Sequence, residues 1–306
     1  MANSVISLAS IPNMLLPGAM GIMMYYDMYP DEWKQIFTVV QSIKNVEVYI
    51  ENEALNGAGR FADGANIPLA SMRQVFTTNA ENFNYGVGFV ITANTLEDNL
   101  YPDQFPKGML GIRENMKTFQ EYEGIAIFDN AFNNQNPLYL LGDGEPLCSN
   151  SHPIATGKIS NTLNSAQLSL TSYQDLIITI QQFQDYSGQP RKILPTKLLV
   201  GIPNQFIAKI LTGSQYTPDD ATNAINPLVA GDYIHGNYIV SHYMTNSSNY
   251  FLLTDYKDGV LLQRRKSLEI QMTTDQANRN LSVYGNERYR FVVPNFRCVA
   301  GVQSFN

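Results

Sequence analysis

Hydrophobic and polar positions alternate in two runs of the first third of the chain. The run over 46–51 places apolar side chains between glutamates and a tyrosine, and the run over 83–91 alternates large apolar side chains with mainly small ones. A period of two is typical of half-buried strands. The segment 56–72 between them is rich in glycine and turn-forming residues. We therefore predict one long hairpin with a loose tip.

The predicted hairpin needs a support, because a hairpin alone in water is only marginally stable and its edges invite pairing with another chain. We expect it to rest on a neighbouring copy of the same chain. An ordinary hairpin within an internal sheet is the alternative interpretation.

Helical periodicity predicts one long helix over about 107–133, with an apolar stripe on one side and charged residues on the other. Weak helix signals at 96–98 precede it, and Pro102 and Pro106 delay its start. A shorter helix is expected from Pro30 to about Ile43, because a proline and two acids occupy its first turn. The stripe of the long helix consists of Met109, Ile112, Met116, Phe119 and Ile127.

The middle of the chain, 158–255, has the rhythm of a compact α/β module. Ser172 is expected to cap a helix that ends near Tyr186. Pro203 is expected to begin a second helix. Short apolar runs at 197–201, 238–240 and 250–253 predict strands. The apolar residues expected inside the second helix are Phe206, Ile207, Ile210 and Leu211.

The last fifth of the chain, from residue 249, alternates strand-like runs with turns and is crowded with arginine. Arginine is a planar, permanently charged donor that is enriched at protein–protein contacts. No catalytic motif accompanies these residues, so the segment indicates a surface that meets other protein surfaces. The basic residues are Lys257, Arg264, Arg265, Lys266, Arg279, Arg288, Arg290 and Arg297.

The composition limits the classes of function. Of the 306 residues, 44% are hydrophobic and 15% are charged, and the formal net charge is −7. A dedicated nucleic-acid binder usually carries a basic balance, so the charge argues against tight sequence-specific DNA binding. The low charged fraction fits a protein that buries much of its surface in neighbours, although a compositional bias of the genome explains it equally well.

The turn-rich segment GDGEPLCSNSHP at 142–153 contains residue types that serve in active sites. Cys148 and His152 form a potential nucleophile pair, but no third, orienting residue is evident. Asp143 and Glu145 lack the spacing of a calcium loop, and neither GxGxxG nor GxxxxGK is present for a phosphate. Two distant cysteines, Cys148 and Cys298, make neither a disulfide framework nor a metal motif. We expect a loop connector, with no enzyme activity, cofactor or metal.

Residues 1–29 are apolar and rich in methionine, and two prolines interrupt them. They lack a positively charged start, so neither a signal peptide nor a membrane helix is expected. An arm that lies along a partner is the favoured interpretation, and a segment packed in the chain's own core is the alternative.

Four segments in order resemble the major capsid proteins of tailed bacteriophages, which have the HK-ninety-seven-like fold. They are the arm and hairpin up to 92, the long helix, the loop GDGEPLCSNSHP, and LLVGIPNQFIAKILTGS with the closing strands. FLLTD, QRR and ERYRF in the closing strands are the most specific elements. The resemblance covers nearly the whole chain. It implies an α+β fold with an N-terminal arm (1–44), an extended hairpin or E-loop (45–92), a peripheral domain with a spine helix (93–157 and 256–306) and an axial domain (158–255).

The resemblance implies a structural function. Subunits assemble as hexamers and pentamers into the icosahedral head of the virion, which encloses phage double-stranded DNA, after assembly in the host bacterial cytoplasm. The implied partners are other copies of the chain, a separate scaffolding protein, the portal, a decoration protein and DNA bound by weak non-specific contact, with no membrane. Another phage structural protein, of the tail or head-completion class, and an α/β enzyme with an unrecognised site are the alternatives.

The resemblance also implies contacts between acids and arginines of adjacent subunits, with the spine-helix acids Glu114, Glu121 and Glu123 as further candidate partners. Two departures from the type member are visible. No long charged coiled coil precedes the arm, so either a separate scaffold exists or the chain is already processed, and the initiating Met1 favours the first. No lysine lies between Lys44 and Lys107, so the covalent lysine–asparagine crosslink of the type member lacks its hairpin nucleophile and we predict non-covalent assembly. The expected interface residues are Glu47, Glu51, Glu53, Arg60, Arg264, Arg265, Arg288 and Arg290.

Overall fold

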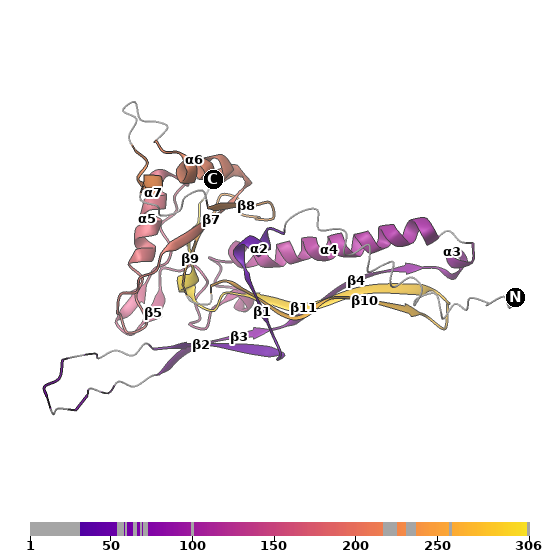
Figure 1. Ribbon diagram of the computed structural model, residues 1–306, viewed down its shortest axis with the longest axis horizontal. Helices are drawn as coiled ribbons and strands as arrows, with labels where there is room; N and C mark the ends of the chain where they lie inside the picture. The colour runs from indigo at the N-terminus through magenta and orange to yellow at the C-terminus, as the bar shows by residue number, and fades with distance from the viewer. Residues whose placement is uncertain are drawn as a thin grey trace.

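The chain forms an elongated layered part, a compact domain at one end of it, and a hairpin below the junction that points away from the elongated part (Figure 1). The hairpin and the two larger parts come from interleaved segments of sequence. The computed structural model describes residues 31–53, 58, 60–63, 66–67, 69, 73–98, 101–216, 225–230, 237–256 and 259–304. The arm expected over 1–30 and most of the hairpin tip lie outside the described residues.

The elongated part is built on a four-stranded sheet in the order β1–β10–β11–β4. The two central strands, β10 (Leu261–Thr274) and β11 (Leu281–Val292), form a long antiparallel pair. At about 3.3 Å per residue, the 14 residues of β10 span roughly 46 Å. Outside them, β4 (Phe83–Ile91) pairs with β11 in antiparallel orientation, and β1 (Thr38–Gln41) pairs with β10 in parallel. These two central strands confirm the strand prediction for the closing segment.

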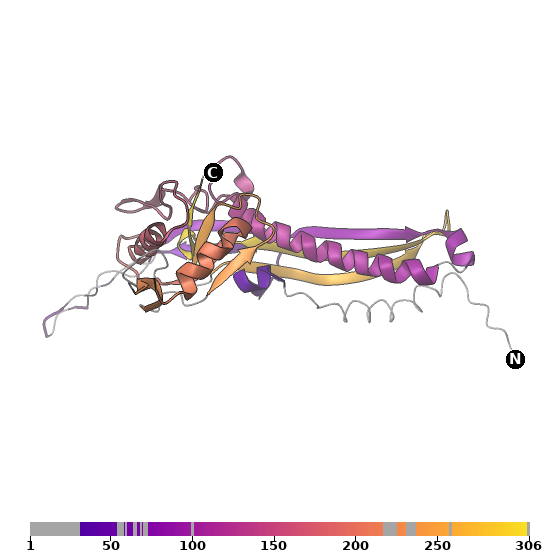
Figure 2. The same cartoon turned by 90° about the horizontal axis from the view of Figure 1, so that it is seen from above.

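Helix α4 (Tyr101–Asp129) runs along the sheet, and the two views agree on this side-by-side arrangement (Figures 1 and 2). Its buried residues Met109, Ile112 and Met116 pack against the sheet in one apolar cluster. Gly285 of β11 permits this close approach, because a Cβ there would lie 2.6 Å from Cγ2 of Ile112. The predicted stripe thus forms the core of the elongated part. Phe119 is an exception, since its side chain is 39% exposed.

The long helix begins and ends earlier than predicted. It starts at Tyr101 and contains Pro106, whereas the prediction over 107–133 let the prolines delay the start. Pro102 lies in the first turn, where backbone N–H groups have no partner within the helix, whereas Pro106 lies beyond that turn and the helix continues through it. The short helix α3 (Ala93–Glu97), capped by Thr92, precedes it.

The hairpin has a different second strand from the one predicted. Strand β2 (Val46–Asn52) pairs with β3 (Gln74–Glu81), while β4 joins the long sheet. Buried Asn82 separates β3 from β4 and donates to Ser42 Oγ and the Lys44 carbonyl. The chain changes sheet at this residue, because the apolar side of β4 packs with α4. The prediction that 83–91 forms the returning arm of the hairpin was wrong.

The short N-terminal helix is also different. Helix α2 covers only Trp33–Ile36, and residues up to Ile43 are not helical. The next residues, Thr38–Gln41, form β1 at the edge of the long sheet. β-Branched residues favour this extended conformation over a helix. Buried Trp33, Ile36 and Phe37 fix the turn in the core.

The compact domain has a four-stranded sheet in the order β12–β9–β7–β8. Its helices are α5 (Leu170–Gln181), α6 (Gln205–Gly213) and the short α7 (Pro227–Ala230). Strand β9 is buried throughout, and its Tyr250 and Leu252 pack with α5 in one core. The cap of α5 is Ser169 rather than Ser172, which completes a capping box from the third helical position. The strands are β7 (Pro195–Gly201), β8 (Tyr238–Ser241), β9 (Tyr250–Thr254) and β12 (Val299–Val302).

The described chain passes between the elongated part and the compact domain three times. It enters the domain after α4 through the small hairpin of β5 (His152–Ile154) and β6 (Gly157–Ile159), and leaves it between β9 and β10. It returns after β11 through a 3-10 turn at Phe296–Cys298 and adds β12 beside β9. The expectation that all of 256–306 belongs to the peripheral domain is therefore wrong for β12. A second 3-10 turn at Ile202–Asn204 leads into α6.

Candidate subunit interface

The hairpin of β2 and β3 has an unusual polarity. Its apolar side chains Val46, Val48 and Ile50 are 36%, 50% and 49% exposed. The alternate residues Glu47, Tyr49 and Glu51 are less exposed and face the rest of the chain. In β3, Thr77 and Asn79 lie opposite Ile50 and Val48 on the same outer side. We call this side the outer face of the hairpin. An exposed aliphatic row on a projecting hairpin marks a surface that another molecule covers.

Polar contacts hold the inner side of the hairpin to the body. Glu51 Oε1 accepts a hydrogen bond of 2.6 Å from Nη1 of Arg297, and the Tyr49 hydroxyl donates to Gln263 Oε1 at 3.1 Å. Glu53 accepts from the Ser187 hydroxyl at 2.9 Å and lies 3.4 Å from Arg73 Nε. These polar contacts act together with the packing of Tyr49 against buried Ala80, Leu261 and Val292.

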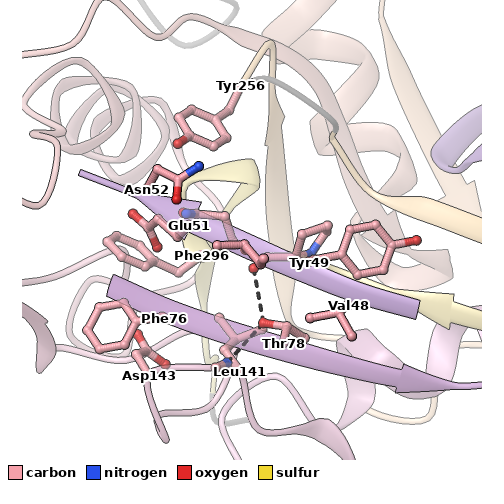
Figure 3. A pocket seen from close by; sticks show the side chains of 14 residues that line it. Val48, Tyr49, Glu51, Asn52, Phe76, Thr78, Leu141, Asp143, Tyr256 and Phe296 are labelled. Carbon is pink, nitrogen blue, oxygen red and sulfur yellow. Dashed lines mark hydrogen bonds between the residues drawn. The ribbon is translucent and has the colours of Figure 1, made fainter. Parts of the chain in front are cut away.

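A cavity of about 360 Å³ lies between the hairpin and the body, as Figure 3 shows. Thr78 bridges one side of it, donating to the Pro294 carbonyl at 3.3 Å and accepting from the Gly142 N–H at 3.1 Å. Phe76 extends from β3 and forms an edge contact with Tyr186. The hairpin is thus attached by a ring of polar contacts around an open space, which differs from the dense packing of a core.

Glu47 is bound within its own chain. Its Oε1 accepts hydrogen bonds from the Ser42 hydroxyl at 2.9 Å and from two backbone N–H groups at 3.1 Å. The Ser42 bond is the main reason that the pKa of Glu47 lies below its ordinary value, and the backbone bonds add to it. Glu47 therefore stabilises the turn before β2.

The predicted arginines fall into different environments. Arg288 donates to the Asn82 carbonyl and to Asn45 Oδ1, and Arg290 donates to the Leu138 carbonyl at 2.7 Å and lies over Phe83. Burial lowers the pKa of Arg290. Arg60 and Arg265 are exposed, and Arg264 lies beside the ring of Trp33. Among the described residues, the arginines expected at the interface form no pair with a hairpin acid, whereas Arg297 of the same closing segment pairs with Glu51 of its own chain. Their contact with a neighbouring subunit stays a prediction.

Two of the three predicted acids of α4 accept hydrogen bonds within their own subunit, and the third is exposed. Glu121 accepts from the backbone N–H groups of Glu32 and Trp33 at 2.7 and 3.0 Å, so it caps the start of α2. Burial raises its pKa to about 7, although these two hydrogen bonds act in the opposite direction. Glu123 accepts from the Tyr85 hydroxyl at 3.0 Å. Glu114 is exposed and remains a candidate for an external contact.

A second exposed apolar surface lies on the compact domain. Ile202 in the turn before α6 and Phe206 and Ile210 on α6 are 46%, 70% and 42% exposed, at a spacing of four residues. Of the four residues predicted to be inside this helix, Leu211 is buried, and the prediction was wrong for Phe206, Ile207 and Ile210. The buried face of α6 consists of Ala208, Leu211 and Thr212, so part of its apolar surface remains exposed.

The loop at 142–153 is a structural connector. His152 is fully buried, with Nδ1 2.7 Å from Asp143 Oδ2, Nε2 3.2 Å from Asn161 Oδ1, and its ring stacked on Phe296. Asp143 is thus the orienting residue that the sequence did not reveal. Cys148 is buried, however, and burial raises the pKa of its thiol, which makes this thiol a poor nucleophile.

Two further properties bear on the class of site. Among the residues that the structure describes, no three His, Cys, Asp or Glu side chains are grouped to hold a metal ion. Within the same residues, no helix combines the length and the apolar character needed to cross a membrane. The most distinctive surfaces of the described chain are therefore its exposed apolar rows.

Comparison with solved structures identifies the architecture. No protein-family model matches the sequence, and a comparison with curated proteins gave no match. A capsid of an empty GTA particle is 11% identical with a TM-score of 0.54, over 100% of this chain and 93% of that chain. A chain of Microbacterium phage Oxtober96 is 13% identical with a TM-score of 0.53, over 100% and 95% of the two chains.

A virus-like particle from Pyrococcus furiosus gives a third match, 10% identical with a TM-score of 0.51 over 95% of this chain and 98% of that chain. The matched length includes the elongated part and the compact domain together. The structural matches establish a shared fold. At sequence identities this low, they do not establish a shared function. The chain has the α+β, HK-ninety-seven-like fold of viral capsid proteins.

Proposed function

We propose that the chain is a major capsid protein, which assembles as hexamers and pentamers into the icosahedral head of a bacteriophage around double-stranded DNA. The observation that carries the proposal is the outer face of the hairpin, where Val46, Val48 and Ile50 are exposed while the acids of the strand turn inward. In a free subunit, this polarity leaves apolar area of the outer face exposed to water. A neighbouring subunit that covers the outer face would remove this apolar area from water along the whole strand.

Seven of the eight predicted interface residues divide into two roles in this proposal, direct contact and indirect support. Exposed Arg60 and Arg265 contact neighbouring subunits directly. Glu51 and Glu53 hold the hairpin at its base, and so act on the interface through its direction. Glu47, Arg288 and Arg290 also act indirectly, through the elements that they stabilise. Arg264 belongs to neither group, because it lies beside the ring of Trp33.

The role is structural rather than catalytic, and the finished protein belongs to the virion. Assembly takes place in the host bacterial cytoplasm with a separate scaffolding protein. The shell then contacts the portal and, through weak non-specific contacts, the packaged DNA, and its outside is the place for a decoration protein. The acidic balance of the chain supports weak rather than tight DNA contact.

Electron microscopy of the purified chain, alone and with a co-expressed scaffold, tests the proposal. Closed shells or hexamers are expected. The variant Val48→Asp places a charge in the outer face and is expected to lower assembly at least about tenfold, because a buried unpaired charge is strongly unfavourable at an interface. Ile178→Asp is the matched control, since Ile178 on α5 is also 50% exposed and lies outside the hairpin.

The result is decisive in either direction. Assembly that is lost in Val48→Asp and kept in Ile178→Asp supports the proposal. A monodisperse wild-type monomer that never assembles, with or without scaffold, contradicts it.

A further inference from the structure

A second cavity, of about 300 Å³, opens between α2, α4, β10 and β11 on the elongated part. Trp33 comes from α2, Arg113 and Lys117 come from α4, and Arg264 and Glu287 come from the paired central strands. We call it the tryptophan pocket. It lies apart from the hairpin base, and none of the contacts described for the hairpin uses its residues.

Three polar atoms of residues lining the tryptophan pocket are buried without a hydrogen-bond partner among the described residues. They are Nε1 of Trp33, Nε of Arg264 and Oε1 of Glu287. Trp33 is 2% exposed and Glu287 is 4% exposed. A buried polar atom without a partner costs about 1–3 kcal/mol, and native proteins contain few of them. Two of the three atoms, Trp33 Nε1 and Arg264 Nε, are donors on residues of one cavity, and they indicate an acceptor group that enters it and completes their hydrogen bonds.

The donors select the chemistry of that group. Trp33 Nε1 can only donate, and so can Arg264 Nε. The guanidinium carbon of Arg264 lies 5.4 Å from the centre of the Trp33 ring, so the two side chains that carry these donors are neighbours. Two neighbouring residues of one cavity, each with an unpaired N–H donor, match the two oxygens of a carboxylate or another oxyanion.

The charge of the tryptophan pocket points the same way. Four cations line it against two carboxylates, while the whole chain has a net charge of −7. One carboxylate, Asp31, is engaged by Lys34 at 2.5 Å and by Lys117 at 3.1 Å. Burial raises the pKa of the other, Glu287, to about 7, which reduces its negative charge near neutral pH. The four cations are Lys34, Arg113, Lys117 and Arg264.

We propose that the tryptophan pocket binds the carboxylate of an aspartate or glutamate from a second copy of this chain, with Trp33 and Arg264 as its donors. The hairpin acids Glu47, Glu51 and Glu53 are engaged within their own subunit, so the carboxylate comes from another part of the second copy. This inference rests on the proposed shell-forming function and adds a specific contact to it.

A DNA phosphate is the competing occupant, and the structure favours it less. Binding to a DNA backbone depends on several phosphates neutralised along a basic track. The tryptophan pocket is a single cationic cavity in an acidic chain, and it carries two carboxylates of its own. A single carboxylate needs one such cavity and no track.

Assembly of variants without nucleic acid tests the inference. Arg264→Gln removes the charge, and Trp33→Phe removes only the Nε1 donor while keeping a ring. Arg279→Gln is the matched control, because it makes the same change of charge in the turn between β10 and β11, where the side chain is exposed and does not line the pocket. The expected result is an increase of at least about tenfold in the protein concentration required for assembly of Arg264→Gln, with a smaller increase for Trp33→Phe.

Thermal unfolding of the unassembled variants separates folding from assembly, and Trp33→Phe decides if Arg264→Gln does not fold. An equal effect of Arg264→Gln and Arg279→Gln, or no effect of Arg264→Gln and Trp33→Phe, overturns the inference while wild-type shells still support the proposed function. Defects that appear only in DNA-filled particles also overturn it and identify a phosphate as the occupant.

Zero-length carbodiimide coupling then identifies the carboxylate. Shells assembled from an equal mixture of ¹⁴N- and ¹⁵N-labelled subunits are coupled, digested and measured by mass spectrometry. We expect mixed-isotope peptides that join Lys34 or Lys117 to an aspartate or glutamate of another copy. Coupling of these lysines exclusively within single-isotope peptides, for example to Asp31, contradicts a carboxylate from a second copy.

Discussion

Replacing Glu51 with alanine removes the counter-charge of a buried arginine at the base of the hairpin. The side chain of Arg297 is 2% exposed, and that of Glu51 is 17% exposed. Arg297 keeps its other hydrogen bonds in the variant, from Nε to the Gln184 carbonyl at 2.6 Å and from Nη1 to Asn295 Oδ1 at 3.2 Å. The guanidinium therefore stays buried with its charge uncompensated. Breaking such a pair from one side costs about 3–5 kcal/mol.

Urea unfolding of the unassembled subunit measures this loss. At a slope of about 3 kcal/mol/M, a loss of 3–5 kcal/mol lowers the midpoint by about 1–1.7 M with the slope unchanged. Glu81→Ala is the control on the same hairpin. Glu81 is exposed, and its Oε1 accepts a long hydrogen bond of 3.5 Å from Asn45 Nδ2. We expect Glu81→Ala to change the unfolding free energy by less than about 0.5 kcal/mol.

A second variant separates loss of the charge pair from loss of contact in general. In Glu51→Ala/Arg297→Met both charges are absent, so no uncompensated charge is buried. We expect the double variant to be at least as stable as Glu51→Ala, which requires a coupling energy between the two sites. The reasoning is refuted if Glu51→Ala is no less stable than Glu81→Ala, or if the two substitutions add without coupling.

Three further predictions concern the core, the pH dependence and the assembled shell. Gly301→Ala places a Cβ 2.5 Å from the Phe251 ring and is expected to cost about 1–3 kcal/mol in thermal unfolding, whereas Gly111→Ala, with no atom within 4 Å, is expected to stabilise the subunit; equal melting temperatures contradict this. The folded-state pKa of Glu287 is raised from 4.5 to about 7, so its contribution to stability is present below pH 4.5 and is lost as the pH rises through 7. Glu287→Gln should flatten that part of the decline in unfolding free energy, and an unchanged slope contradicts the assignment. Denaturing gels of mature shells are expected to show single subunits, and ladders of linked subunits would be evidence against non-covalent assembly.

The sequence was sufficient for elements with a long, regular pattern. The 12 residues of β11 and the stripe of α4 each repeat their period often enough to identify the element. It was insufficient for partners, because a period of two defines the faces of a strand but not the strand it pairs with. Strand β4 was therefore joined to the wrong neighbour. The four residues of β1 are too few to outweigh the helix signal that precedes them.

The candidate interface was predictable in kind and not in detail. The alternation over 46–51 gave two faces of β2, but only the structure shows that the apolar face is outside and the acids are inside. The density of arginines indicated a role, whereas their environments depend on contacts across more than 200 positions of sequence, such as that of Arg297 with Glu51. Trp33 was recognised only as part of a helix start. Its unpaired Nε1 beside Arg264 depends on the packing of α2 against the long sheet.

The three passages of the chain between the elongated part and the compact domain affect how the subunit bears force. Three covalent connections join the two parts in parallel. The last of them ends in β12, which is paired with β9 along four residue pairs. A protease that cuts one connection leaves the two parts tethered by the other two. In the proposed shell, tension on the subunit would likewise be shared among three backbone connections. A subunit nicked once between these parts is therefore expected to keep its place in a pressurised shell.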